Sequence, residues 1–412
     1  MSPQVRPQPT GLAAPPLRRP RRLRVLGTDI SLLVQVRDRA IADLGFDIEF
    51  EVLDFLNCQR KAALQPAAYD IYDQCFHNLD IVWFWGALQP IDTHRITDWN
   101  RLSGLTKEGG LSSNAWRGHG DAPVRKLYVQ PGAFLGPDPM RHISMLPTVY
   151  NLDSFAYDRR VFSPATGARE SWAWLLDPRA KGRIALVDEP AIGIFDAALA
   201  AEAAGELQFA NIGNMTIEEI DALMALLHDR RKQGYFCGVW RNAAEAHTLL
   251  CDGRIAAQSM WSPGYGDLGD MARVIVEAAP VEGYRAWHGG MSLSRAAAGA
   301  ERDMAYDYMN WWLSGWPGAV MARQGYYMSI PERVREALLP QEWAYWYDGR
   351  EAATDLPGPA GNTVVRAGAA RPGGAYTERA NRIAVWNTAM DEHNYASRAW
   401  ERFVIGVREA AG

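Results

Sequence analysis

The sequence predicts an α/β protein of two lobes that are joined by two crossings of the chain. Its 412 residues exceed what one compact core usually holds. From residue 23 onward, strand-like apolar runs alternate with helical patterns, which is typical of βαβ units around a parallel sheet. The chain leaves the first unit near residues 147–153 and returns near residues 283–292. Two crossings of this kind indicate a two-segment hinge, which permits closure over a ligand in a cleft between the lobes.

The first lobe begins with an alternation of strand and helix. Residues 23–27 form an apolar run that predicts a buried strand, and Asp29 or Ser31 can cap the helix that follows it. Apolar residues alternate across 46–53, which predicts a second strand. Residues 65–75 are expected to be helical.

The second lobe is predicted over residues 148–289. A strand opens it, and a later strand over 182–190 ends in two acids and a proline, Asp188, Glu189 and Pro190. Expected helices lie at 191–205, 216–233 (opened by the capping box Thr216 to Glu219) and 242–250, with strands at 255–261 and 273–278.

The first lobe is expected to comprise residues 23–147 together with 290–412, including the C-terminal helices. Residues 355–375 are rich in Gly and Pro, which predicts a surface excursion. Residues 1–22 are rich in Pro, Arg and Ala, which predicts a disordered basic segment. Helices are expected at 301–312, 332–338 and 396–409.

Tryptophans recur where strands are predicted to end. A strand over 80–85 would carry Trp83 and Trp85 on the same side, and Trp261 and Trp287 each precede small or turn residues. An aromatic ring at the carboxyl end of a strand is placed to line a crevice, although ordinary core packing is the alternative for each. The pattern predicts a ligand cleft with flat aromatic walls.

Polar residues accompany these aromatics. Asp188 and Glu189 could meet a cationic ligand, or could simply cap the helix after Pro190, whose N-terminus could equally receive an anion. His288 follows Trp287 directly and is a candidate ligand contact.

The overall charge is compatible with a cationic ligand. The net charge is −5, but six arginines lie in the first 24 residues with no acid among them, so the rest of the chain carries about −11. An acidic body does not favour contact with a nucleic-acid backbone, and solubility alone could explain it.

Several functional classes leave no trace in the sequence. There is no nucleophile-elbow, phosphate-loop, zinc-protease or dinucleotide motif, so we expect neither catalytic residues nor a cofactor. The four cysteines lack metal-ligand spacing, and buried thiols are the simpler interpretation of them. No apolar stretch reaches 18 residues, and Asp29 interrupts the region where an export signal would need an apolar core.

Several motifs together resemble the extracellular solute-binding proteins of bacterial ABC importers, in particular the spermidine/putrescine-binding type. The resemblance extends from about residue 23 to residue 349. It rests on residues 80–82, on Ser171 and Trp172 before 175–178 and 182–185, on 250–261, on 284–292 and on 315–327.

This resemblance implies a periplasmic-binding-protein-like fold, with two α/β lobes that hold a small amine or polyamine between aromatic faces and acids. It also implies a monomer that is located in the periplasm and delivers its ligand to a membrane permease, without enzymatic activity. By position, the implied ligand contacts are Thr28, Asp29, Trp83, Trp85, Asp188, Glu189, Trp261, Trp287 and Tyr326.

Two features depart from the family pattern. The polyamine-binding type carries a carboxylate two residues after the tryptophan that matches Trp287, where this chain has Gly289. The first loop has Gly27, Thr28 and Asp29 in place of aromatics. Both departures favour a compact amine or an amino-acid-like ligand over a long polyamine. A cytosolic enzyme or ligand sensor with a two-lobed transferase-like fold is the alternative.

Overall fold

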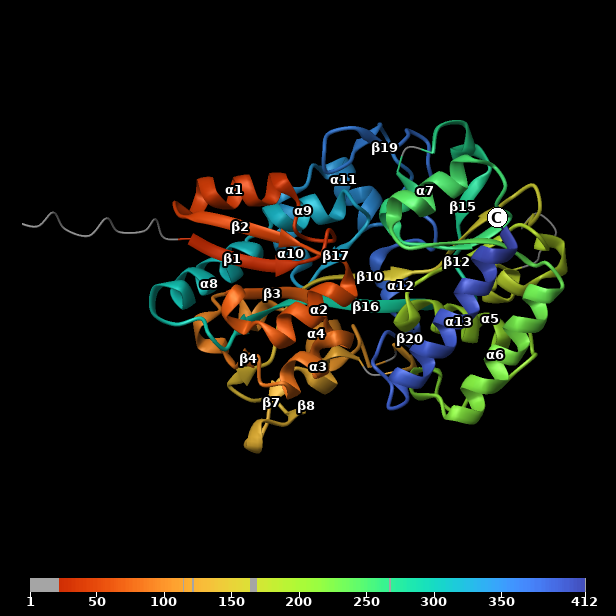
Figure 1. Ribbon diagram of the computed structural model, residues 1–412. Helices are drawn as coiled ribbons and strands as arrows, with labels where there is room; N and C mark the ends of the chain where they lie inside the picture. Colours follow the sequence, from red (N-terminus) through yellow and green to blue (C-terminus); the bar gives the residue numbers. More distant parts are fainter. Residues whose placement is uncertain (1–21, 114, 121, 164–168, 267, 412) are drawn as a thin grey trace, which may run out of the picture.

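The computed structural model describes residues 22–113, 115–120, 122–163, 169–266 and 268–411, and it has two α/β lobes (Figure 1). Each lobe is built on its own sheet, and the predicted fold class is confirmed. The expectations for residues 1–21 lie outside the described residues.

The first sheet has the strand order β17-β10-β16-β3-β1-β2, with β20, β6 and β4 attached to it. Strand β1 pairs in parallel with β2 and β3, while β16 pairs antiparallel with β3. Its strands are β1 (Arg22–Gly27), β2 (Asp47–Val52), β3 (Ile71–Cys75), β4 (Leu88–Gln89), β6 (Trp116–His119), β10 (Leu146–Asp153), β16 (Tyr284–Ser294), β17 (Tyr327–Met328) and β20 (Arg382–Trp386).

The second sheet has the order β13-β12-β14-β11-β15. Strand β12 is parallel to both β13 and β14, so the carboxyl ends of these three strands lie at the same edge. Its strands are β11 (Phe155–Asp158), β12 (Ile184–Val187), β13 (Phe236–Trp240), β14 (Ala257–Ser259) and β15 (Ile275–Glu277). Two small sheets hold β5 (Ile91–Asp92), β7 (Tyr128–Val129), β8 (Leu135–Gly136) and β9 (His142–Ile143), and β18 (Leu356–Pro357) and β19 (Thr363–Val365).

The described helices cover these sheets (Figure 1). Their bounds are α1 (Val34–Leu44), α2 (Phe55–Leu64), α3 (Leu79–Phe84), α4 (Gly104–Glu108), α5 (Pro190–Ala203), α6 (Ile217–Lys232), α7 (Ala243–Cys251), α8 (Gly299–Trp312), α9 (Trp316–Ala322), α10 (Pro331–Ala337), α11 (Pro340–Trp346), α12 (Tyr376–Ala380) and α13 (His393–Ala411). The predicted capping box from Thr216 to Glu219 opens α6, and both of its hydrogen bonds are present.

Strands β10 and β16 pair with each other and connect the two lobes, and we call them the crossing ribbon (Figure 1). Beyond Asp153 the chain enters β11 of the second sheet, while β16 returns to the first. Because alternate residues of a strand face opposite sides, Asn151 and Asp153 share one face of the ribbon with Arg285 and Trp287.

Three local predictions were wrong. Residues 65–75 do not form a helix: α2 ends at Leu64, and the buried strand β3 occupies Ile71–Cys75. Residues 80–85 do not form a strand, because Leu79, Val82 and Trp83 are buried at helical spacing on α3. The residue before α1 is Leu33, whose side chain makes no cap, so neither Asp29 nor Ser31 caps that helix.

The C-terminal helix α13 packs in a different place from the one expected. We assigned residues 290–412 to the first lobe, whereas α13 contacts β13, α5 and α6 of the second. Trp400 of α13 is fully buried there, and a Cβ at Gly193 of α5 would lie only 2.2 Å from the ring of Trp400. The second lobe is therefore completed by a segment that lies far along the chain from its sheet.

Candidate functional site

The carboxyl end of β3 lies beside the crossing ribbon, and the acids that follow β2 and β12 are within electrostatic range of this region. Asp54 follows β2, Cys75 ends β3, and Glu189 follows β12. Burial raises the pKa of the Cys75 thiol, and the charge of Glu189 contributes to this shift across the two lobes. The charge of Asp54 likewise contributes to the raised pKa of Glu189. Ligands of open α/β sheets bind at such strand ends, so this region is the candidate binding site.

An aromatic pair lies against the ribbon. Trp287 of β16 and Tyr326, which precedes β17, make an edge-to-face contact with ring centroids 5.3 Å apart. Trp287 is 5% exposed and Tyr326 is 4% exposed. The two rings form a buried corner against the ribbon, and both belong to the hydrophobic core of the first lobe.

A carboxylate holds the indole ring in place. The Nε1–H of Trp287 donates a hydrogen bond of 2.7 Å to Oδ2 of Asp153 on the neighbouring strand. Burial raises the pKa of Asp153 to about 6, although the charge of Arg285 and the bond from Trp287 oppose that shift.

Polar groups of the ribbon and of the second lobe lie beside this corner. Nδ2 of Asn151 donates two hydrogen bonds, one of 2.6 Å to Oδ1 of Asp153 and one of 2.7 Å to Oγ of Ser262, a residue that follows β14. Oδ1 of Asn151 and the hydroxyl of Tyr265 are buried and have no hydrogen-bond partner among the described residues. Burial raises the pKa of Tyr265, and the charges of Glu277 and Asp153 add to that shift.

Further carboxylates surround the site. Asp29 is solvent-accessible, but the surrounding protein desolvates it enough to raise its pKa. Burial raises the pKa of Glu189 to about 7, and that of Asp73, which accepts a hydrogen bond of 2.8 Å from Ser31, to about 7. An excess of carboxylates with little positive charge to balance them favours a cationic ligand.

The arginine of the ribbon is balanced by acids. Nε of Arg285 donates 2.6 Å to Oδ1 of Asp196 on α5, and both side chains are fully buried. Nη2 of Arg285 lies 3.8 Å from Oδ2 of Asp153. Burial raises the pKa of Asp196 to about 6. Arg285 is thus shared between two carboxylates, and the cluster adds no net positive charge.

Several of the residues expected at the site come together. Asp29, Glu189, Trp287 and Tyr326 lie around the same strand ends, and Asp29 contributes to the raised pKa of Tyr326 after burial and Asp153. Thr28, immediately before Asp29, is buried. Trp287 is the fourth residue of an eleven-residue strand, so it does not end a strand as expected.

The other tryptophans lie elsewhere. Trp83 is buried in the first lobe, where its Nε1–H donates 2.9 Å to the carbonyl oxygen of Ala133. Trp85 is 65% exposed just after α3, so the expected side-by-side placement of Trp83 and Trp85 was wrong. Trp261 packs edge-to-face on the buried Trp240, with 4.8 Å between ring centroids, and it directly precedes Ser262.

Two polar candidates are engaged in other contacts. Asp188 forms ion pairs with Arg241, at 3.2 Å, and with Arg408 of α13. His288 lies on the ribbon face opposite Trp287, where its ring packs 5.0 Å from that of Tyr150, and burial lowers its pKa to about 3. His288 is therefore a core residue in this structure, while Glu189 caps α5 and stays close to the site.

Sequence reasoning missed Asn151, Asp153, Ser262 and Tyr265. A signal for the first two was present, because Asn151 and Asp153 alternate with apolar residues in a strand that is buried along its whole length. Buried polar residues on one face of a strand indicate either a partner or a ligand.

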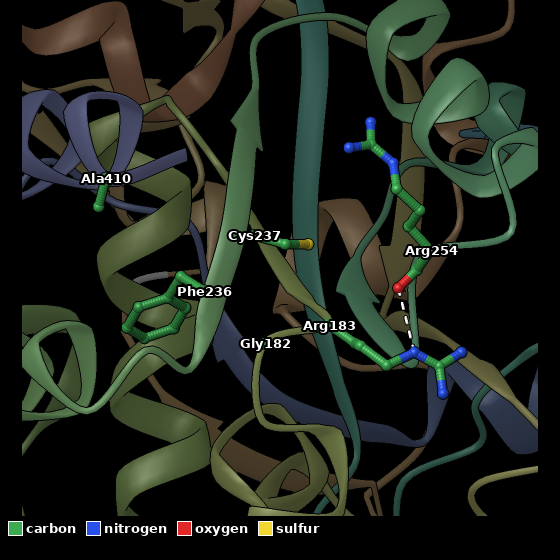
Figure 2. Close-up of a pocket in the computed structure, with 6 residues that line it drawn as sticks. All are labelled: Gly182, Arg183, Phe236, Cys237, Arg254 and Ala410. Atoms are coloured by element: carbon green, nitrogen blue, oxygen red, sulfur yellow. Dashed lines mark hydrogen bonds between the residues drawn. The ribbon is translucent and has the colours of Figure 1, made fainter. Parts of the chain in front are cut away.

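A surface hollow of about 440 Å³ lies at the other edge of the second sheet (Figure 2). It is lined at the amino ends of the strands by Arg183, Phe236 and Arg254, and Nε of Arg183 donates 3.2 Å to the carbonyl oxygen of Arg254. This edge is opposite to the one that bears Glu189, so the hollow does not belong to the candidate site.

No group of three or more His, Cys, Asp or Glu side chains in the described ranges is placed to hold a metal ion. None of the described helices is both long enough and apolar enough to cross a bilayer.

Comparison with known proteins reveals similarity in structure only. No family model and no curated protein matches the sequence. A putative spermidine/putrescine ABC transporter from Listeria monocytogenes superposes with a TM-score of 0.63 at 13% identity, covering 93% of this chain and 98% of that one. The spermidine/putrescine substrate-binding protein PotD from Streptococcus pneumoniae gives 0.61 at 11% identity, covering 95% and 99%. AgtB from A. tumefaciens, in complex with agropinic acid, gives 0.56 at 12% identity, covering 93% and 98%. The chain therefore has the two-lobed fold of ABC-transporter substrate-binding proteins.

Proposed function

We propose that this chain is the substrate-binding component of an ABC import system and captures a small organic solute between its lobes. The observation that carries the proposal is the corner formed by Trp287 and Tyr326 on the crossing ribbon, beside the carboxyl end of β3 and within electrostatic range of Glu189 after β12. The resemblance of the sequence and the similarity of the fold to such proteins support it.

The proposed ligand is a small amine. A polyamine is the more specific candidate within this class of ligands. The supporting evidence is the set of carboxylates at the site, Asp29, Asp153 and Glu189, beside the aromatic corner. An aromatic face contributes roughly 0.5–2 kcal/mol to binding a cation. A carboxylate supplies the charge partner that a buried ammonium group requires.

The proposed mode of action is capture and delivery without chemical change. Closure of the lobes about the ribbon would exclude water from the ligand, and a membrane permease would receive it after opening. Such a role also implies a location outside the cytoplasmic membrane, where the protein would meet its solute.

The test is the recovery of a bound solute and its effect on lobe closure. Native mass spectrometry of protein purified from its own host should reveal a bound small molecule. Small-angle scattering should then show that the protein is more compact with the re-added solute than without it. If the solute is chemically altered on incubation, the protein is an enzyme. If no solute from host extract binds, the binding proposal fails.

A further inference from the structure

The family resemblance implies a carboxylate two residues after Trp287, where this chain has Gly289 packed closely against the neighbouring strand. A Cβ at Gly289 would lie 3.1 Å from Cγ1 of Val149 and 3.3 Å from its carbonyl oxygen. A side chain at this position would be tightly packed, and Val149 would have to shift by a few tenths of an ångström. The function of that carboxylate, if the site retains it, must therefore come from another element.

The neighbouring strand of the ribbon supplies a carboxylate. Asn151 lies opposite Trp287 in the register of β10 and β16, and Asp153 lies opposite Arg285. The two β10 side chains therefore lie on the same face as the indole. Asp153 already contacts that indole through the hydrogen bond to Nε1–H of Trp287.

The corner has acceptor capacity that the protein does not use. Asn151 is fully buried, and its amide nitrogen is committed to Asp153 and Ser262, which leaves Oδ1 as the atom without a partner among the described residues. Each oxygen of Asp153 accepts one hydrogen bond, whereas a carboxylate oxygen can accept two. A buried amide oxygen left unsatisfied is destabilising, so a ligand that donates a hydrogen bond to it would bind more tightly.

Resting on the function proposed above, we propose that Asn151 and Asp153 form a subsite for hydrogen-bond donors, which selects a primary ammonium group beside Trp287 over a quaternary one. Oδ1 of Asn151 and the carboxylate of Asp153 would accept the N–H bonds, and the indole would contact the attached carbon chain. A box of aromatic rings alone would bind a quaternary ammonium group at least as well, because that group needs no acceptor.

The experiment compares two probes of equal length and charge by calorimetric titration at pH 8, where Asp153 is ionised. One is 1,4-diaminobutane, and the other is its bis(trimethylammonium) analogue. We expect the primary diamine to bind at least tenfold more tightly. Equal or tighter binding of the quaternary probe would overturn the subsite, and this comparison needs no variant that might misfold.

The variants Asn151→Leu and Asp153→Asn test whether these two residues cause the preference for the primary diamine. Each variant should weaken binding of the primary diamine at least tenfold. Asn151→Leu keeps the charge of Asp153 and should leave the affinity for the quaternary probe within about threefold of wild type, whereas Asp153→Asn should weaken the quaternary probe by a smaller factor than the primary diamine. The matched control is Asp158→Asn, which removes an equally buried carboxylate from β11 that is paired with Arg160 and Arg183, away from the ribbon. It should leave both affinities unchanged. Wild-type affinity for the diamine in either ribbon variant would contradict the assignment.

A third probe, adipate, separates failure of the subsite from failure of the proposed function. If adipate binds and neither amine does, the donor subsite is wrong while a solute-binding role stands. If none of the three binds and host extract supplies no solute either, the proposed function itself fails.

Discussion

The indole N–H of Trp287 and the carboxylate of Asp153 are joined by a hydrogen bond of 2.7 Å between the two strands that connect the lobes. The bond fixes the orientation of the ring, and it ties an aromatic wall of the candidate site to the crossing ribbon. A ligand that contacts Trp287 therefore acts on a group that belongs to both crossings of the chain.

The first prediction concerns the ring itself. Trp287→Ala should weaken binding of the captured solute by roughly 1–3 kcal/mol, because it removes both a stacking face and a wall that excludes water. Trp287→Phe should retain most of the face and lose only the hydrogen bond to Asp153. Its loss should thus be clearly smaller by calorimetry. Equal losses in the two variants would mean that the ring face contributes nothing.

The second prediction separates the two neighbouring acids after β12. Glu189→Gln should weaken the binding of a cationic solute, because the charge of the Glu189 carboxylate acts on Cys75 and is itself affected by Asp54 at the candidate site. Asp188→Asn should leave affinity within about twofold, since Asp188 is engaged by Arg241 and Arg408. Titration of both variants with the same solute decides between them, and a larger effect at Asp188 would contradict this placement.

The third prediction is a pH dependence of stability without ligand. Burial raises the pKa values of Asp153 and Asp196 to about 6 and that of Glu189 to about 7. In the unfolded chain these groups titrate near 4, so between pH 4 and 7 the folded state binds more protons than the unfolded state. Their contribution to the free energy of unfolding therefore falls as pH rises through that window, by the order of 1–3 kcal/mol for Asp153.

Urea unfolding at pH 5 and at pH 7.5 measures this slope. Asp153→Asn should flatten it, because an amide does not titrate. An unchanged slope in that variant would show that Asp153 titrates normally in the folded protein.

The fourth prediction tests the packing of the C-terminal helix. Trp400→Ala should lower the free energy of unfolding by about 3–5 kcal/mol, because Trp400 is fully buried against α5 of the second lobe. Ile405→Ala, on the exposed side of the same helix, should change it by less than about 1 kcal/mol. Similar small effects in both variants would mean that α13 detaches easily.

The fifth prediction concerns a tryptophan that the sequence placed in the cleft. Trp85→Ser should change neither solute affinity nor stability by more than about 0.5 kcal/mol, since this side chain is 65% exposed outside the site. The fluorescence of the variant should lose a component that emits at long wavelength. A loss of affinity would contradict this assignment and show that Trp85 contributes to ligand binding.

The parts of the fold that could be predicted from sequence were those with a local signal. The apolar run of β1 and the capping box of α6 each lie within a few adjacent residues. Strand β3 was not predicted, because its buried residues include the polar Asp73 and Gln74, which interrupt the apolar run. In α3 the aromatic residues suggested a strand, although the spacing of Leu79, Val82 and Trp83 was already helical.

The site was only partly predictable for a different reason. Trp287 and Glu189 stand out in the sequence by residue type, and Glu189 follows β12 as expected, whereas Trp287 lies inside β16 instead of at its end. The part played by Asp153 depends on its alignment opposite Arg285 and beside Trp287, more than 130 positions later in the chain. No local pattern contains the register of two such distant strands.

The contact between Trp400 and Gly193 also bears on how the protein is made. The core of the second lobe includes side chains of α13, and the first sheet needs β16 between β10 and β3. Neither lobe can therefore finish folding while the ribosome has delivered only the stretch that carries its first strands. Contacts of such long sequence separation slow folding, so the growing polypeptide should stay open to chaperones until residue 411 has emerged.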